Sequence, residues 1–131
     1  MTTWTVGIGL LLAAIAGAFA QDTPVSKVPL RMSYHACIKT ARGVTVALNN
    51  CIGTEHAYQD KRLNAAYQRL RKMLPVGQAT SLRDEERAWI SQRDMTCAPD
   101  KNGGTASLLD SNQCQLDQTA TRAALLEDRG K

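Results

Sequence analysis

Four cysteines are the residues of this chain with the most sharply defined chemistry: Cys37, Cys51, Cys97 and Cys114. Thiols can bind a metal or form disulfides. Structural zinc sites usually pair their ligands two to four residues apart, whereas the nearest pair here, Cys37 and Cys51, is fourteen positions apart. His35 adds only a single His-x-Cys pattern. We therefore predict two disulfides, with no metal and no other cofactor.

Four cysteines can pair in three ways, and the sequence alone leaves all three open. Cys97 and Cys114 flank a glycine-rich segment between two predicted helices, which makes them natural partners. A straight helix from Cys37 to Cys51 would separate its ends by roughly 21 Å, far beyond the reach of a disulfide. Gly43 permits a turn between them, however. We favour Cys97–Cys114 with Cys37–Cys51, and pairings that join the N-terminal to the C-terminal cysteines are the alternatives.

Groups capable of acid–base catalysis are few. His56 could act as a general base, but it lies on a predicted apolar helix face and no nucleophile signature accompanies it. The run Asp84, Glu85 and Glu86 falls in the first turn of another predicted helix, where carboxylates complement the helix dipole. We predict that the chain is not an enzyme. A hydrolase that uses His56 with this acidic run is a rival hypothesis.

Helical periodicity must position these groups, since no segment alternates apolar and polar residues over a useful length. The clearest helix is expected over 54–74, with Pro75 ending it and Gly77 completing the turn. Its apolar stripe comprises Leu63, Tyr67, Leu70 and Leu74, extended backwards by Ile52 and His56. Its opposite, basic face comprises Lys61, Arg62, Arg69 and Lys72.

A second helix is expected from about residue 81 to residue 95. Ser81 is its predicted N-cap. Leu82 and Trp89 mark its buried face. Arg93 and Asp94, which follow on the same helix, are interpreted as a buried or half-buried ion pair that orients helices.

The remaining segments complete the expected fold. Pro, Asn and Gly residues predict a loop over 98–104, and a last helix is expected over 111–127. Helix signals also begin near Cys37, with Gly43 and Gly53 as candidate breaks. The sequence thus predicts an all-α fold, a small bundle of three to four helices stapled by two disulfides.

The N-terminal segment has the pattern of a secretion signal. An apolar run covers 6–19, and small residues near its end fit cleavage after Ala20. We expect a signal peptide over 1–20, a flexible linker over 21–33 and one helical domain over 34–131. A secreted or periplasmic location agrees with disulfides and tells against cytosolic catalysis and nucleic-acid binding.

The charge balance bears on partners. The chain has a net charge of +4 and a pI of about 9.0. Because nucleic acid is not expected in this compartment, the basic helix face is interpreted as solvated or as a contact for an anionic envelope surface. A cell-envelope accessory or structural module that binds an anionic component or a protein partner is therefore the alternative function.

The cysteines and three short segments form a combined pattern: LNAAY at 63–67, ERAWISQRDMTC at 86–97 and, after the last cysteine, TATR at 119–122. This combination resembles the lysozyme inhibitor LprI-type family of small secreted or periplasmic bacterial domains. The resemblance covers roughly residues 34–126. It implies an all-helical, disulfide-bonded domain, inhibition of lysozyme-type muramidases and a protein partner. The motif residues are Leu63, Asn64, Tyr67, Trp89, Arg93, Asp94, Thr119 and Arg122.

One segment has properties suited to inhibition. Retaining glycosidases hold two carboxylates in a cleft, and a stapled, glycine-rich loop that carries a cation could insert there and pair with them. The segment Lys101, Asn102, Gly103 and Gly104, between the last two cysteines, has these properties. We take it as the candidate partner-binding site. The alternative is that it only connects two helices.

Overall fold

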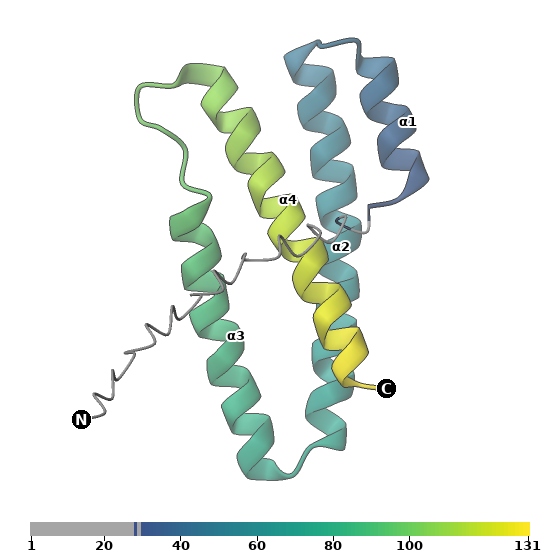
Figure 1. The fold of residues 1–131 in the computed structure, drawn as a ribbon, viewed down its shortest axis with the longest axis vertical. Coiled ribbons are helices and arrows are strands. Elements are labelled where there is room, and N and C mark those ends of the chain that lie inside the picture. Colours follow the sequence, from purple (N-terminus) through teal and green to yellow (C-terminus); the bar gives the residue numbers. More distant parts are fainter. Residues whose placement is uncertain (1–27, 29) are drawn as a thin grey trace, which may run out of the picture.

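The computed structural model describes residue 28 and residues 30–131. The predicted signal peptide and most of the predicted linker lie outside the described residues. Four helices follow one another: α1 (Met32–Ala41), α2 (Thr45–Met73), α3 (Val76–Thr96) and α4 (Gly104–Arg129). No strand occurs among the described residues, and two disulfides are present. The predicted all-α, disulfide-stapled class is confirmed (Figure 1).

A tight turn reverses the chain between α1 and α2. Arg42 and Gly43 both adopt left-handed backbone conformations, with φ of 46° and 78°. Glycine reaches this region without the steric penalty that a Cβ imposes. The turn lays α1 alongside the N-terminal half of α2 (Figure 1), so the break predicted at Gly43 is confirmed.

The junction between α2 and α3 differs from the expectation. Only Leu74 and Pro75 separate the two helices, and α3 already begins at Val76. Gly77 therefore lies inside α3, and Ser81 is not an N-cap, since its hydroxyl donates to the Gly77 carbonyl at 3.1 Å within the helix. Proline is compatible with a helix start because no intrahelical partner is needed for its missing N–H. Both helices consequently meet in a short antiparallel hairpin.

Two further helices begin earlier than the sequence predicted. The helix α2 begins at Thr45 and runs through Gly53 without a break, and α4 begins at Gly104 rather than near residue 111. A single glycine costs a helix only about 1 kcal/mol relative to alanine, which tertiary packing overrides. Ser111 is a buried residue of α4, and its hydroxyl donates to the Cys97 carbonyl at 2.6 Å.

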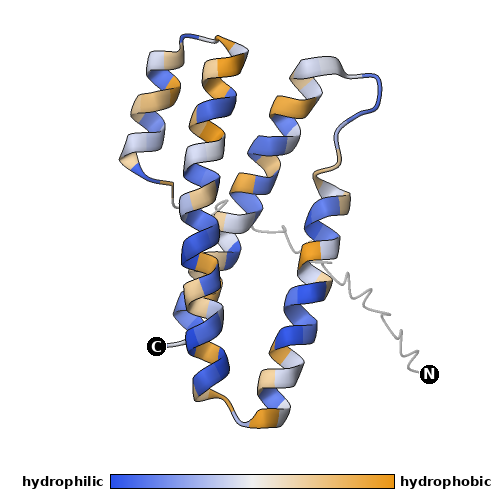
Figure 2. Ribbon diagram, turned by 180° about the vertical axis from the view of Figure 1, so that it is seen from behind, coloured by the Kyte–Doolittle hydropathy of each residue, from blue (hydrophilic) through white to orange (hydrophobic). Residues whose placement is uncertain are grey.

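The apolar core is divided into two clusters, both built mainly between α2 and α4. The end of the molecule near the α2–α3 hairpin, called here the apolar end, buries the larger one: Leu63, Ala66, Leu70, Leu82, Ala123 and Leu126. The opposite end, called the stapled end because both disulfides lie there, buries Tyr34, Ile52 and Leu116. Figure 2 shows hydrophobic residues as isolated bands on otherwise hydrophilic helices, as amphipathic packing requires.

Candidate functional site

The disulfides pair as the sequence analysis favoured. Cys37 joins Cys51 across the α1–α2 turn, with their Cα atoms 5.8 Å apart. Cys97 joins Cys114, with Cα atoms 5.5 Å apart, and ties the end of α3 to the third turn of α4. No free cysteine remains among the described residues. Each bridge thus fastens a turn or loop to a long helix.

The candidate partner-binding loop lies between α3 and α4, and hydrogen bonds hold its backbone. The Asn102 N–H donates to Asp100 Oδ1 at 2.9 Å, and the Gly103 N–H donates to the Asp100 carbonyl at 3.1 Å. The Asp100 N–H donates to Ser107 Oγ in α4 at 2.6 Å. An aspartate that bonds the backbone two residues ahead forms a compact turn. The loop is therefore shaped by its own contacts.

The loop conformation requires glycine at two adjacent positions, for different reasons. A Cβ at Gly103 would lie 2.3 Å from the Cβ of Ser107, closer than real Cβ contacts come. Gly104, the first residue of α4, has a φ of +61°, which glycine adopts far more readily than other residues. The Gly-Gly pair thus admits a close approach to α4 and then a sharp entry into that helix.

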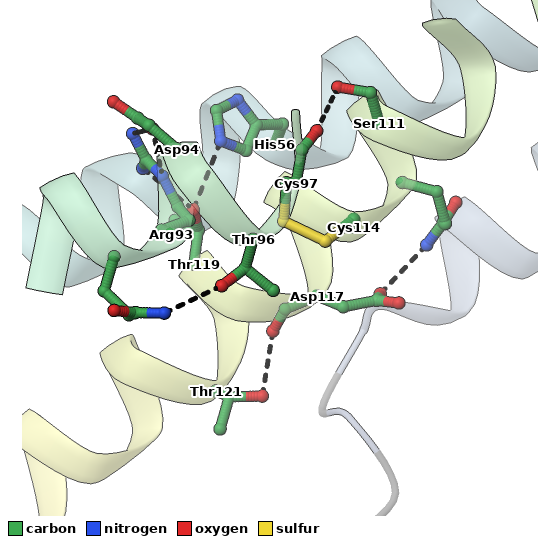
Figure 3. Close-up of a disulfide and its surroundings, with 12 residues drawn as sticks. His56, Arg93, Asp94, Thr96, Cys97, Ser111, Cys114, Asp117, Thr119 and Thr121 are labelled. Atoms are coloured by element: carbon green, nitrogen blue, oxygen red, sulfur yellow. Dashed lines mark hydrogen bonds and ion pairs between the residues drawn. A yellow bond between two sulfur atoms is a disulfide. The ribbon is translucent and has the colours of Figure 1, made fainter. Parts of the chain in front are cut away.

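The polar side chains of the loop face solvent. Lys101 and Asn102 are exposed, and within the described part of the chain Lys101 makes no ion pair. In Figure 2 the outer part of the loop between α3 and α4 is blue, the colour of hydrophilic residues. At the base of the loop, the buried Ser111 hydroxyl and the Cys97–Cys114 bridge anchor it to α4 (Figure 3). The result is a fixed protrusion with an unpaired cation.

A polar cluster behind this bridge joins α2, α3 and α4 (Figure 3). Arg93 pairs with Asp94 at 2.8 Å, with the arginine side chain 15% and the aspartate 54% exposed. The predicted half-buried ion pair therefore forms, but both members belong to α3. The contact that links helices is instead Arg93 to the buried Thr119 hydroxyl, at 3.4 Å.

His56 belongs to the same cluster. Its Nε2 lies 3.2 Å from Thr119 Oγ1. The residue lies well inside α2, because this helix begins at Thr45 and not near residue 54 as predicted. Burial lowers the pKa of His56, and Arg93 lowers it further against an opposing effect of Asp60. Among the residues that the structure describes, the only hydroxyl within hydrogen-bonding distance of His56 is that of the fully buried Thr119. The predicted packed histidine describes this environment better than a general base beside an accessible nucleophile.

The acidic run lies well inside α3 and not in its first turn as predicted, because this helix begins at Val76. Asp84 pairs with Arg83 of the same helix, whereas Glu85 and Glu86 contact α4. Arg122 Nε donates to Glu86 at 2.8 Å, and its Nη2 donates to Glu85 at 2.6 Å. Arg129 also pairs with Glu85 at 2.7 Å. Hydrogen bonds from these arginines overcome the effect of burial and lower the pKa of Glu85. These carboxylates are therefore engaged with cations of α4 and not with His56.

Four of the eight motif residues meet at the α3–α4 junction: Trp89, Arg93, Thr119 and Arg122. The guanidinium carbons of Arg93 and Arg122 lie 5.1 Å and 5.8 Å from the ring centroid of Trp89, within cation–π range. Thr119 completes this group. Their shared position indicates that the motif fastens α3, which has little apolar contact of its own, to the α2–α4 pair.

The LNAAY motif of α2 contributes both buried and exposed side chains. Leu63 is buried in the larger cluster, and Tyr67 packs against its edge. Asn64 is exposed and donates to the Asp60 carbonyl one turn earlier at 2.9 Å. The Arg71 guanidinium lies 5.6 Å from the Tyr67 ring centroid.

Sequence reasoning missed a buried polar network in α2. Glu55 is 1% and Gln59 0% exposed. Glu55 accepts hydrogen bonds from the Arg31 Nε at 2.8 Å, the Arg31 backbone N–H at 3.1 Å and Gln59 at 2.7 Å. Burial alone would raise the pKa of Glu55, but these bonds lower it. The spacing of these residues could have predicted the network, because positions 52, 55, 59 and 63 lie on the same face of a helix.

The predicted basic face of α2 needs one correction. Lys61, Arg69 and Lys72 are exposed, as expected. Arg62 is partly buried, since its Nε donates to Glu127 of α4 at 3.0 Å and its Nη1 donates to Gln59 at 2.7 Å. The helix wheel placed Arg62 on the exposed basic face, whereas its side chain instead contacts Glu127 across the interface with α4.

The described residues offer neither a metal site nor a membrane-spanning helix. No group of three or more His, Cys, Asp or Glu side chains there could hold a metal ion. No helix in residues 30–131 is long and apolar enough to span a bilayer.

Comparison with known families decides the relationship. The model of the family described as lysozyme inhibitor LprI matches residues 37–126, from the first cysteine to the last buried leucine of the core. This chain belongs to the LprI family. Its match covers both disulfides, the loop between α3 and α4 and the whole α3–α4 motif cluster. Neither the curated proteins nor the solved structures gave a match.

Membership of the LprI family supports a lysozyme-inhibitor-like function for the chain. The family match also confirms the resemblance that the sequence motifs indicated. The two disulfides of this LprI protein fit an oxidising compartment.

Proposed function

We propose that this protein is a secreted or periplasmic inhibitor of lysozyme-type muramidases and is not itself an enzyme. The observation that carries the proposal is the family match together with a fixed, solvent-facing loop at the stapled end. The proposal includes a signal peptide cleaved after Ala20 and a helical domain over 34–131.

The inhibitory element we propose is the loop segment Lys101, Asn102, Gly103 and Gly104. A muramidase cleft with catalytic carboxylates is anionic, so the exposed ammonium of Lys101 would be attracted into it. The hydrogen bonds that Asp100 accepts and the neighbouring disulfide hold the loop before binding. A loop that is already ordered loses less conformational freedom on association, which favours affinity.

The experiment is a muramidase activity assay with the purified, disulfide-bonded protein. Wild type is expected to inhibit, and Lys101→Ala is expected to weaken inhibition about tenfold or more, because a cation paired with desolvated carboxylates contributes strongly. Lys72→Ala, which removes an exposed cation of α2, is the matched control and should inhibit like wild type. Absence of inhibition by wild type contradicts the proposed class, whereas equal inhibition by Lys101→Ala contradicts only the loop.

A second candidate function rests on the cations of α2. Lys61, Arg69 and Lys72 are exposed and form no ion pair among the described residues, so they could contact an anionic envelope component. This hypothesis predicts that the protein sediments with sacculi or anionic vesicles and is released as salt screens the charges. Retention that does not respond to salt would contradict it.

A further inference from the structure

A small polar pocket opens between α2 and α4 at the stapled end, apart from the loop. Its volume is about 190 Å³. It is lined by Asn49, Ile52, Gly53, His56, Asn112 and Gln115. Neither of the two functions proposed above uses this pocket.

The lining offers hydrogen-bonding groups without formal charge. Asn112 Nδ2 donates to Asn49 Oδ1 at 2.7 Å across the two helices. This bond leaves the Asn49 amide hydrogens and the Asn112 oxygen available to a ligand. His56, whose pKa burial lowers, is predominantly neutral at pH 7. The pocket therefore suits an uncharged ligand with both donors and acceptors.

Gln115 supplies an unpaired amide. Its side chain is half-buried and makes no hydrogen bond within the described residues. No fully buried side-chain nitrogen or oxygen of the described residues lacks a partner, so the Gln115 amide is still reached by solvent, which a ligand could replace. A ligand in the pocket could bond both its oxygen and its nitrogen.

Gly53 gives an independent indication. It lies inside the 29-residue helix α2, where glycine is less favourable than alanine. A Cβ at this position would meet nothing within 4 Å, so no neighbouring group among the described residues requires the glycine. Its effect is to leave the helix backbone bare at the wall of the pocket, where a ligand could approach closely.

We propose that this pocket binds one acetamido-sugar unit, such as an N-acetylhexosamine residue of a glycan. An acetamido group carries a carbonyl acceptor, an N–H donor and a methyl group. Gln115 and the two asparagines can bond its polar atoms, and Ile52 offers the methyl an apolar contact. The bare backbone at Gly53 leaves room for the face of the sugar ring. This proposal goes beyond muramidase inhibition and does not depend on it.

The test is a binding titration of the purified protein with a short chitin oligosaccharide, followed by NMR or calorimetry. A cellulose oligosaccharide of the same length, which has a hydroxyl in place of each acetamido group, is the ligand control. Binding of the first and at least about tenfold weaker binding of the second are expected. No binding of the chitin oligosaccharide, or equal binding of both, overturns the proposal.

Glycine variants then separate binding from folding. Gly53→Ala is expected to raise the Tm, because alanine favours the helix, yet to weaken binding about tenfold or more by filling the pocket wall. Gly77→Ala in α3 also replaces a helical glycine that has open space around it. It should not lower the affinity. Unchanged affinity in Gly53→Ala, or an equal loss in Gly77→Ala, overturns the proposal.

A third variant tests the polar contact. Gln115→Leu keeps a side chain of similar size but removes the unpaired amide, so binding is expected to fall about tenfold while the Tm is retained or raised. Affinity equal to wild type would overturn the assigned role of the amide. Soluble muropeptides in a parallel titration show whether peptidoglycan sugars, which carry the same acetamido group, bind as chitin sugars do.

Discussion

The stapled end and the apolar end of the bundle are held together by different means. At the apolar end, six apolar residues of α2, α3 and α4 form a buried cluster without any covalent link. At the stapled end, the buried apolar cluster comprises only Tyr34, Ile52 and Leu116, and both disulfides lie there. A bundle this small buries limited apolar area, and the cross-links are placed where that area is smallest.

The same comparison explains where function can reside. The apolar end is occupied by packing, and its polar side chains form ion pairs such as Arg129 with Glu85. The stapled end can carry exposed polar elements, namely the Lys101 loop and the pocket beside Gly53, because the disulfides supply stability that a core would otherwise provide. Both proposed sites consequently lie at the same end.

The largest effect that tests this comparison is removal of both disulfides. Closing loops of 14 and 17 residues should stabilise the fold by about 3 kcal/mol each. Replacing all four cysteines with alanine should therefore lower the free energy of unfolding by about 6 kcal/mol, which is comparable to the whole stability of a small domain. Urea denaturation followed by circular dichroism measures this, with each pair also removed separately. A loss under about 1 kcal/mol per bridge would show that the staples are dispensable.

A smaller loss is expected from the apolar end. Leu126 is 0% exposed in the larger cluster, so Leu126→Ala should cost about 2–5 kcal/mol through lost burial and a residual cavity. Its neighbour Leu125 is 44% exposed, and Leu125→Ala should change stability by less than about 0.5 kcal/mol. Urea denaturation of both variants provides the measurement. Equal effects at the two positions would contradict the assignment of this cluster as the core.

The smallest of the three effects concerns Glu55, between the two ends. Glu55→Gln removes the charge that binds Arg31 and should cost about 1–3 kcal/mol at pH 7. The folded-state pKa of Glu55 is lowered, so its stabilising contribution is present above the unfolded value of about 4.3 and is lost as pH falls through the folded value. The stability difference between wild type and Glu55→Gln should therefore shrink on acidification below about pH 4.

Denaturation curves at several pH values measure this difference. Asp84→Asn, which removes an exposed partner of Arg83, is the control and should have an effect below about 1 kcal/mol at every pH. A Glu55→Gln effect that stays constant down to pH 3 would indicate a packing defect and not the loss of a buried charge interaction.

Local signals in the sequence were sufficient for several features. The spacing of the cysteines favoured disulfides over a metal, and the turn at Gly43 made the observed Cys37–Cys51 pairing feasible. The apolar stripe correctly identified Leu63 and Leu70 as core residues. The predicted starts of the helices that begin at Thr45, Val76 and Gly104 were wrong. Glycine and serine residues were taken as helix boundaries, whereas in the structure the helices continue through them because tertiary packing stabilises them.

By itself the sequence determined the helical class, the presence of covalent staples and the family, because each depends on residue types and on spacings along the chain. Only the tertiary structure decided which polar groups became partners. Arg62 meets Glu127 across 65 positions, and Arg31 meets Glu55 across 24. The pocket at Gly53 likewise exists only where α4 crosses α2. Periodicity reports which face of a helix is buried, but the opposing residues are chosen by how the helices pack.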